Sequence, residues 1–225
     1  MIFPIRINKY LRDRGLASRR EADKIIASGL VLVNGQPAQT GMLVREKDRV
    51  VVNKEYHKEY IYLAYYKPRG LATQDHRGLP SVMENFKEKS LFPLGRLDKE
   101  SEGLLILTND GRITKNITGN NGEMEKEYIV EVRERLSPNI VNIFKKGMST
   151  QALGKLLPAK VKIINDHALQ VILREGKRHQ IRVMLNELNY TVTALKRIRV
   201  GQIKLGNLKP EQTHPLTNEE LNMLQ

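Results

Sequence analysis

The chain has 225 residues, of which 40% are hydrophobic and 28% charged, as is typical of a globular protein with one or two domains. It contains no cysteine, which excludes disulfides and thiolate metal sites, and its five scattered histidines lack ligand spacing, so we expect no metal. No apolar run reaches the ~18 residues of a membrane span. The first residues lack the apolar core of a signal peptide, so we expect a cytoplasmic protein without membrane contact.

The net charge of +13 favours a polyanionic partner, because each Lys or Arg placed on a phosphate releases counterions. Positive charge is densest in residues 1–53, which hold ten Lys or Arg and five Asp or Glu. The alternative is a generally basic protein without a nucleic-acid partner. If there is such a partner, its contacts are expected first in the N-terminal segment.

Residues 6–53 predict a compact unit in which helices precede strands. Ser18 and Glu21 have the spacing of a capping box, in which each side chain bonds the backbone N–H of the other at a helix start. Asn34-Gly35 follows an apolar run and is the strongest short signal for a two-residue hairpin. Val50–Val52 is expected to be the last strand of this unit.

The string KYLRDRGLASRREADKIIASGLVLVNG resembles the S4 RNA-binding domain, over roughly residues 5–53. Without this resemblance, a basic helix would usually be one whose charged side chains simply face the solvent. The resemblance implies phosphate contacts that position the RNA rather than read its bases. The basic residues assigned to this contact are Arg6, Lys9, Arg19, Arg20 and Lys24.

The polar residues 54–59 have no apolar periodicity and predict a short linker that lets the parts on either side move. We therefore expect two domains, 1–58 and 59–225. In the second domain many strands and few helices follow in no regular βαβ order, which predicts an α+β domain with a mainly antiparallel mixed sheet. Strands are expected near 60–66, 104–108, 126–132 and 169–173, and helices near 181–188 and after the capping pair Thr217 and Glu220.

The most unusual local sequence is FPLGRLDKESEGLLILTNDG, residues 92–111, which places Asp98 between Arg96 and Lys99 ahead of an apolar strand. Neighbouring positive charges favour an ionised carboxylate, which is able to act as a nucleophile at neutral pH. By itself, however, an Asp beside an Arg is more often part of a turn or an ion pair.

GRLDKESEGLLILTNDG resembles the catalytic motif of pseudouridine synthases, in the branch that carries an S4 domain. Three further motifs of that family occur in the expected order along the chain, namely Lys-Pro-Arg-Gly at 67–70 before it, and Lys-Glu-Tyr at 126–128 and Gly-Lys-Arg-His-Gln-Ile-Arg at 176–182 after it. Four linked motifs are far more specific than one, and the likeness spans nearly the whole chain. It is greatest to the F type of the ribosomal large-subunit synthases, and it implies a small S4 domain followed by the family's catalytic domain.

The resemblance implies a role for each matching residue. Asp98 is the essential carboxylate, which attacks or deprotonates the ribose–base unit so that the uracil detaches and rejoins through carbon; whether attack falls on the ribose or on the base stays open. Tyr128 stacks on the extracted uracil, although on pattern alone it is equally an ordinary core residue. Arg182 pairs with Asp98 and holds its orientation. Arg96 fills the space left by the flipped nucleotide or holds its phosphate, and Lys67 contacts RNA.

One departure concerns the third motif, where the S4-bearing branch commonly has Arg-Gln-Ile-Arg-Arg. This chain has His179 and Val183 at the ends of that stretch, which is more similar to a sister branch. We interpret His179 as a helix-start residue without a chemical role. The departure leaves the target uridine open.

We therefore expect an enzyme, an RNA pseudouridine synthase (an isomerase), that acts as a monomer on structured RNA. The substrate is expected to be 23S ribosomal RNA, with transfer RNA as the other possibility. The reaction has no net redox change and the chain has no phosphate-binding loop, so no cofactor is expected. Two alternatives are a non-catalytic S4-type protein of RNA binding or ribosome assembly and, less well supported, a tRNA ligase without a nucleotide-binding signature.

Overall fold

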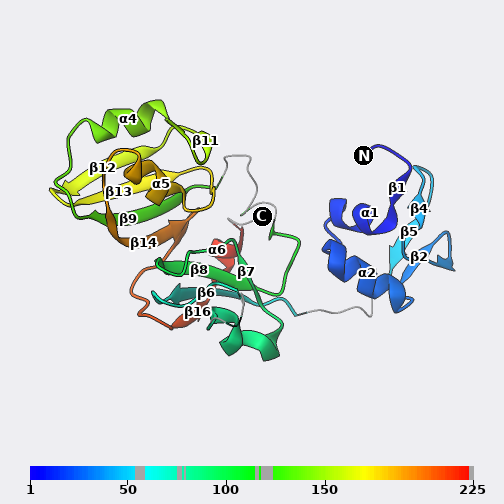
Figure 1. The fold of residues 1–225 in the computed structure, drawn as a ribbon. Coiled ribbons are helices and arrows are strands. Elements are labelled where there is room, and N and C mark those ends of the chain that lie inside the picture. Colours follow the sequence, from blue (N-terminus) through cyan, green and yellow to red (C-terminus); the bar gives the residue numbers. More distant parts are fainter. Residues whose placement is uncertain (54–58, 75–77, 79, 115–116, 118–123, 223–225) are drawn as a thin grey trace. The chain divides into compact units, whose positions relative to one another are not determined.

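The computed structural model describes residues 1–53, 59–74, 78, 80–114, 117 and 124–222, with only the backbone described at 87–89. By its contacts the chain divides into two units, Met1–Tyr60 with Asp110–Ile113, and Ile61–Asn109 with Thr114–Gln225 (Figure 1). Most of the linker expected at 54–59 lies outside the described residues, so the boundary at residue 58 stays a prediction. None of the described helices has the length and apolar character needed to cross a membrane.

The first unit packs two short helices against small sheets. The elements in chain order are β1 (Ile5–Arg6), α1 (Ile7–Asp13), α2 (Arg19–Ala27), β2 (Val31–Val33), β3 (Gln36–Pro37), β4 (Leu43–Val44) and β5 (Val50–Val52). β1 pairs with β4, and β2 lies between β3 and β5. Buried aliphatic side chains from α1, α2 and β2, among them Leu11, Ile25 and Val31, form one core.

Local signals in this unit are confirmed. The Ser18 hydroxyl accepts from the Glu21 N–H, and the Glu21 carboxylate accepts from the Ser18 N–H, each at 3.3 Å. Asn34 and Gly35 have φ of 53° and 82°, as a two-residue turn between β2 and β3 requires. These contacts fix the ends of the elements, while the apolar face of α2 supplies most of its packing.

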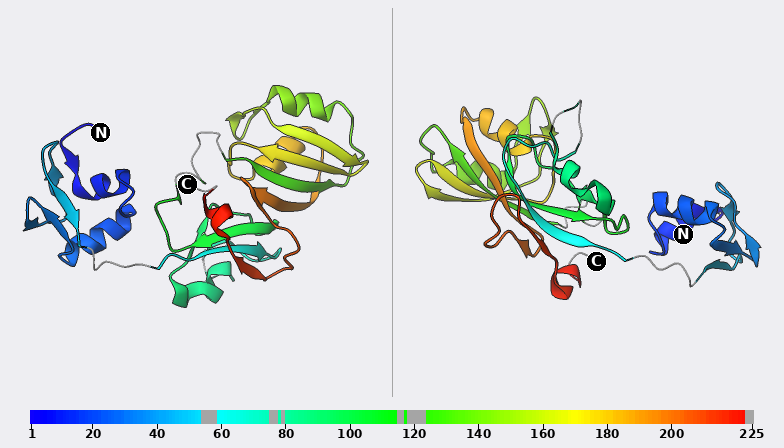
Figure 2. Two further views of the ribbon diagram at one scale, coloured as in Figure 1. Left: turned by 180° about the vertical axis from the view of Figure 1, so that it is seen from behind. Right: turned by 90° about the horizontal axis from the view of Figure 1, so that it is seen from below.

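The second unit is built on a nine-stranded sheet within the described residues (Figures 1 and 2). Its main path is β12-β13-β9-β14-β8-β6-β16, with β15 paired to β14 and β7 to β8. Of the pairs in this sheet, β14 with β8 is parallel and the rest are antiparallel, so the expected α+β class with a mainly antiparallel sheet is confirmed. The strands are β6 (Tyr62–Lys67), β7 (Phe92–Leu94), β8 (Glu102–Thr108), β9 (Lys126–Val132), β12 (Lys160–Asn165), β13 (Ala168–Leu173), β14 (Val192–Val200), β15 (Ile203–Lys204) and β16 (Thr213–Pro215).

Two cores lie along this sheet. Helices α4 (Ile140–Lys146) and α5 (Gln180–Asn186) share one with the inward side chains of β9, β13 and β14. The 3-10 helix η1 (Val82–Lys89) contributes to the other, with apolar residues of β6 and β8. The remaining elements are the hairpin β10 (Ser149–Thr150) and β11 (Gly154–Lys155), and helix α6 (Asn218–Asn222), which begins at the expected Thr217 and Glu220 capping pair.

The two halves of the sheet meet where β8 runs parallel to β14. Gly103 has φ of +105°, and a Cβ at this position would lie 2.2 Å from the carbonyl oxygen of Arg197. Only glycine allows the two backbones to approach so closely. Because Asp98 stands a few residues before β8, this approach also positions the loop that bears it.

Candidate active site

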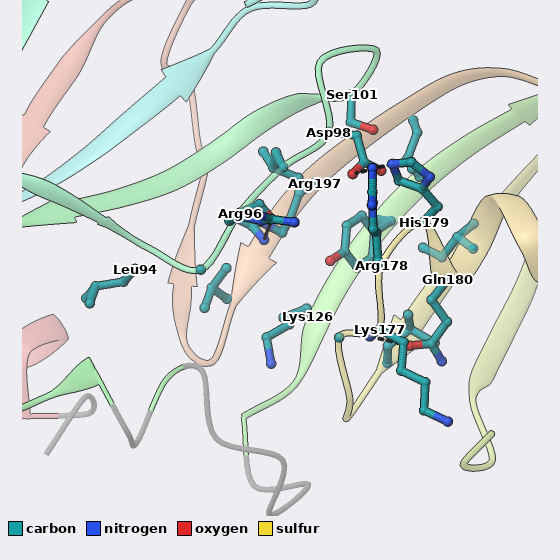
Figure 3. Close-up of a pocket in the computed structure, with 18 of the residues that line it drawn as sticks. Leu94, Arg96, Asp98, Ser101, Lys126, Lys177, Arg178, His179, Gln180 and Arg197 are labelled. Atoms are coloured by element: carbon teal, nitrogen blue, oxygen red, sulfur yellow. Dashed lines mark hydrogen bonds and ion pairs between the residues drawn. The ribbon is translucent and has the colours of Figure 1, made fainter. Parts of the chain in front are cut away.

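A cavity of about 280 Å³ opens beside the junction of β8, β9 and β14 (Figure 3). Its walls come from the loop after β7, from β9 and β14, and from the segment that leads into α5. Two predicted catalytic residues, Asp98 and Tyr128, line it together with Arg96. Segments up to about 100 residues apart in sequence are thus brought together at one concave site, as ligand pockets commonly are.

The loop that bears Asp98 is held by backbone and side-chain bonds on both flanks. The Thr73 hydroxyl donates to the Leu97 carbonyl at 2.6 Å and accepts from the Leu97 N–H at 3.0 Å. After Asp98 the chain turns, since the Ser101 N–H donates to the Asp98 carbonyl at 3.0 Å. The Gly70 N–H donates to the Lys99 carbonyl at 2.8 Å, so residues 70–73 clamp the loop from one side.

Lys67 lies beneath this loop. Its side chain is fully buried, and its ammonium donates to the carbonyls of Ser101 at 2.7 Å, Pro68 at 3.0 Å and Lys99 at 3.4 Å. Burial lowers the pKa of Lys67 to about 8, against the raising effect of nearby carboxylates, first that of Asp98. The RNA contact predicted for Lys67 is therefore wrong, because no part of the side chain reaches the surface; it positions the Asp98 loop instead.

Arg182 also holds this loop, but not by the expected contact. Its guanidinium donates to the Glu100 carbonyl at 2.9 Å and the Ser101 hydroxyl at 3.5 Å. No ion pair joins it to Asp98 in the part of the chain that the structure describes. The predicted pair is wrong for this structure, because the guanidinium turns toward the backbone that follows Asp98.

The partner of Asp98 is His179, whose Nε2 lies 3.2 Å from its Oδ1 (Figure 3). His179 has φ of +55°, a left-handed conformation rare outside glycine, and stands at the N-cap of α5 as the sequence predicted. That conformation positions the residue at the start of α5, where its imidazole meets the carboxylate. The interpretation of His179 as only a helix-start residue missed this contact. Asp98 and His179 belong to different motifs, and the sequence does not show that the two side chains meet.

Tyr128 presents its side chain to the cavity from the middle of β9. It is 9% exposed and joins the core formed by α4 and α5. Across the sheet it pairs with Arg197 on β14, and Lys126 precedes it by two residues, so these three side chains share one face. A flat ring over an apolar core and beside cations is a suitable surface for a nucleobase.

The cavity is strongly positive. Its lining holds five Lys or Arg, namely Arg96, Lys126, Lys177, Arg178 and Arg197, against the single carboxylate of Asp98. Lys126 and Arg197 were missed by sequence analysis, although the spacing of Lys126 from Tyr128 on an alternating strand could have indicated the former. Among the described residues no cluster of three or more His, Cys, Asp or Glu could hold a metal ion.

The RNA-contact residues predicted in the first unit all have exposed side chains. Arg6 lies on β1, Lys9 on α1, and the other three, Arg19, Arg20 and Lys24, on α2. Their exposure permits the predicted phosphate contact, and that contact stays a prediction.

Comparison with known proteins agrees with this architecture. Residues 50–187 match the family described as RNA pseudouridylate synthase, and residues 5–50 match the S4 domain. The chain is 32% identical to the ribosomal large subunit pseudouridine synthase B of Bacillus subtilis (strain 168), over 97% of this chain and 95% of that protein. It is 33% identical to the dual-specificity RNA pseudouridine synthase RluF of Escherichia coli (strain K12), over 96% of this chain and 77% of that one.

A solved structure supports the same assignment. A pseudouridylate synthase crystal structure superposes with a TM-score of 0.75 at 25% identity, covering 98% of this chain and all of that one. The family match covers more than half of the chain, and it includes the Asp98 loop and the Tyr128 strand. The chain therefore belongs to the RNA pseudouridylate synthase family, in a form that carries an S4 domain ahead of the catalytic unit.

Proposed function

We propose that this RNA pseudouridine synthase isomerises a uridine of 23S ribosomal RNA, with Asp98 as its essential carboxylate. The observation that carries the proposal is the meeting of Asp98 and Tyr128 in one cationic cavity. The names of the relatives support the substrate, since one is a ribosomal large subunit synthase and another a dual-specificity RNA synthase. We place the reaction in the cytoplasm and expect a monomer.

The target uridine must leave its stack before its glycosidic bond is reached, which costs a few kcal/mol. Stacking of the uracil on Tyr128, worth about 1–3 kcal/mol, offsets that cost. Arg96 is exposed at the cavity and either fills the space that the flipped nucleotide leaves or holds its phosphate. The exposed basic residues of the S4 unit add phosphate contacts that position the RNA.

Asp98 then acts on the flipped nucleotide. The bond between the ribose C1′ and the uracil N1 breaks, the base rotates, C1′ bonds to C5, and the proton on C5 is lost while N1 gains one. Atoms and charge balance without a cofactor. His179 holds the carboxylate, while Lys67 and Arg182 hold the backbone around it, so that the nucleophile is oriented before RNA arrives.

The test is to map pseudouridines in RNA from cells with and without the protein, and from cells that express Asp98→Asn. We expect one or a few sites in 23S ribosomal RNA to disappear without the protein and to stay absent with Asp98→Asn. The variant is expected to bind RNA within a few-fold of the original affinity. Sites restored by Asp98→Asn would contradict the mechanism, and an unchanged map would favour the non-catalytic RNA-binding alternative.

A further inference from the structure

Two cations in the cavity, Lys126 and Arg197, make no ion pair with any of the described residues. Arg197 is 3% exposed, and its Nε donates to the Leu104 carbonyl at 2.8 Å and its Nη1 to the Arg96 carbonyl at 3.4 Å. Its remaining nitrogen, Nη2, is buried and has no hydrogen-bond partner among the described residues. A buried guanidinium with an unsatisfied donor and no carboxylate is unfavourable in the free protein, which indicates that a ligand completes the site.

Lys126 is the second such cation. Its ammonium donates to the Met124 carbonyl at 3.2 Å and makes no ion pair in the described part of the chain. Burial and the charge of Arg197 lower the pKa of Lys126, so the two cations are near enough to repel each other. An anion between them would relieve that repulsion.

The other cations of the cavity differ from this pair. Lys177 donates to the carbonyls of Leu153 at 2.9 Å and Lys155 at 2.8 Å, and thereby ties the segment before α5 to the β10–β11 hairpin. Arg178 is exposed. Among the cations that line the cavity, the buried Arg197 and the half-buried Lys126 therefore lie on the strands, on the same face of the sheet as Tyr128.

We propose that Lys126 and Arg197 form an anion site that takes a phosphate of the nucleotide whose uracil lies on Tyr128. This inference rests on the proposed function, because the base and the phosphate belong to one nucleotide and enter together. The Lys126 ammonium contacts the phosphate as a point charge, and a phosphate oxygen supplies the acceptor that Arg197 Nη2 lacks. The site thus couples extraction of the base to the neutralisation of two charges that are uncompensated in the free enzyme.

The test compares uridine with uridine 5′-monophosphate and uridine 3′-monophosphate, each titrated calorimetrically into the full chain at low salt. We expect at least one monophosphate to bind about tenfold tighter than uridine, as a charged hydrogen bond provides. The monophosphate that shows the gain identifies which of the two flanking phosphates occupies the site. If neither binds tighter than uridine, the site does not exist.

Lys126→Gln removes the charge and is expected to bring monophosphate and uridine affinities within about threefold of each other. The control is Lys162→Gln, which removes an equal charge from an exposed position on β12 and is expected to keep the gain. A gain that survives in Lys126→Gln places the phosphate elsewhere and overturns the proposal.

Arg197→Gln separates ligand binding from a merely structural role of this side chain. If the variant is folded, as judged by thermal unfolding, we expect it to bind uridine with unchanged affinity but to bind the monophosphate no tighter than uridine. A monophosphate that still binds tighter would show that Arg197 does not contact the phosphate. If the variant does not fold, the affinities of Lys126→Gln decide whether the anion site exists. Failure of the proposed function would give a different result. The phosphate gain would still depend on Lys126, but the protein would form no pseudouridine in any RNA. That outcome would contradict the proposed function and leave the anion site supported.

Discussion

The two units place their functional charges in opposite environments. In the S4 unit most of the basic side chains predicted to contact RNA stand on exposed positions of two short helices. Neighbours in sequence set the ends of these helices, as Ser18 and Glu21 do for α2. In the catalytic unit Lys67, Lys126 and Arg197 are buried or half-buried. Their contacts can join residues far apart in sequence, as Lys67 holds the Asp98 loop and Arg197 reaches the Arg96 carbonyl. Substitution of one exposed charge is therefore expected to leave the others in place, whereas substitution of a buried charge also disturbs the groups that hold it.

The largest effect is expected at the close approach of β8 and β14. Gly103→Ala places a methyl group against the Arg197 backbone, where neither strand can withdraw without breaking the sheet. We expect a loss of about 3 kcal/mol or more in the free energy of unfolding, measured with urea. The control is Gly154→Ala, which has φ of +67° but open space, and is expected to lose only about 1 kcal/mol. Equal losses would mean that the close approach does not matter.

The next effect concerns the orientation of Asp98. Lys67→Met keeps the buried shape but leaves the carbonyls of Pro68, Lys99 and Ser101 without their donor. Because a displacement of about 1 Å at a reacting group lowers a rate about 100-fold, we expect turnover to fall by that order while RNA affinity changes less than threefold. Single-turnover kinetics separates the two. Unimpaired turnover would show that the loop holds its shape without Lys67.

Burial of Lys67 also predicts a pH dependence of stability. Its pKa is about 8 in the folded chain and 10.5 ordinarily, so between these values the unfolded chain binds the proton more tightly. Raising the pH through this window therefore stabilises the folded state of the wild type relative to Lys67→Met, by about 2 kcal/mol between pH 8 and pH 10. Urea unfolding of both proteins at each pH measures the difference. A constant difference would contradict the lowered pKa.

The same contrast explains what could be predicted from the sequence. The Asn34-Gly35 hairpin, the Ser18 and Glu21 capping box and the alternating strand at 126–132 were predicted because each signal is local. Strand β14 was missed because the buried cation Arg197 interrupts its apolar alternation. Family resemblance named Asp98 and Tyr128, which do line one cavity.

The family resemblance did not predict the contacts that hold the active-site residues in place. The pairing of Asp98 with His179 rather than Arg182, and the burial of Lys67, depend on how a loop, a helix start and a strand end meet in space. No spacing within a motif encodes such a meeting. Sequence therefore indicated which residues gather at the site, and the fold determined which of them touch.

In the S4 unit, by contrast, the effects of single substitutions on RNA binding are expected to be additive. The double variant Arg19→Gln and Arg20→Gln is expected to lower the slope of log affinity against log salt by about two, because each exposed cation accounts for about one phosphate contact. Filter binding of ribosomal RNA over a salt series measures the slope. The matched control neutralises Arg45 and Arg49, exposed residues of the same unit outside the helices. An equal loss in the control would show that the helical face is not the contact.

The smallest effect is expected at the start of α2. Ser18→Ala removes the acceptor for the Glu21 N–H, and loss of such a cap costs about 1 kcal/mol. Because the helix presents Arg19 and Arg20, fraying of its first turn should weaken RNA binding about twofold without changing the turnover of bound RNA. Urea unfolding and single-turnover kinetics on saturating RNA check both parts. The conservative Ser18→Thr keeps the hydroxyl acceptor and is expected to restore stability and binding. Failure of threonine to do so would show that the serine acts through something other than its cap.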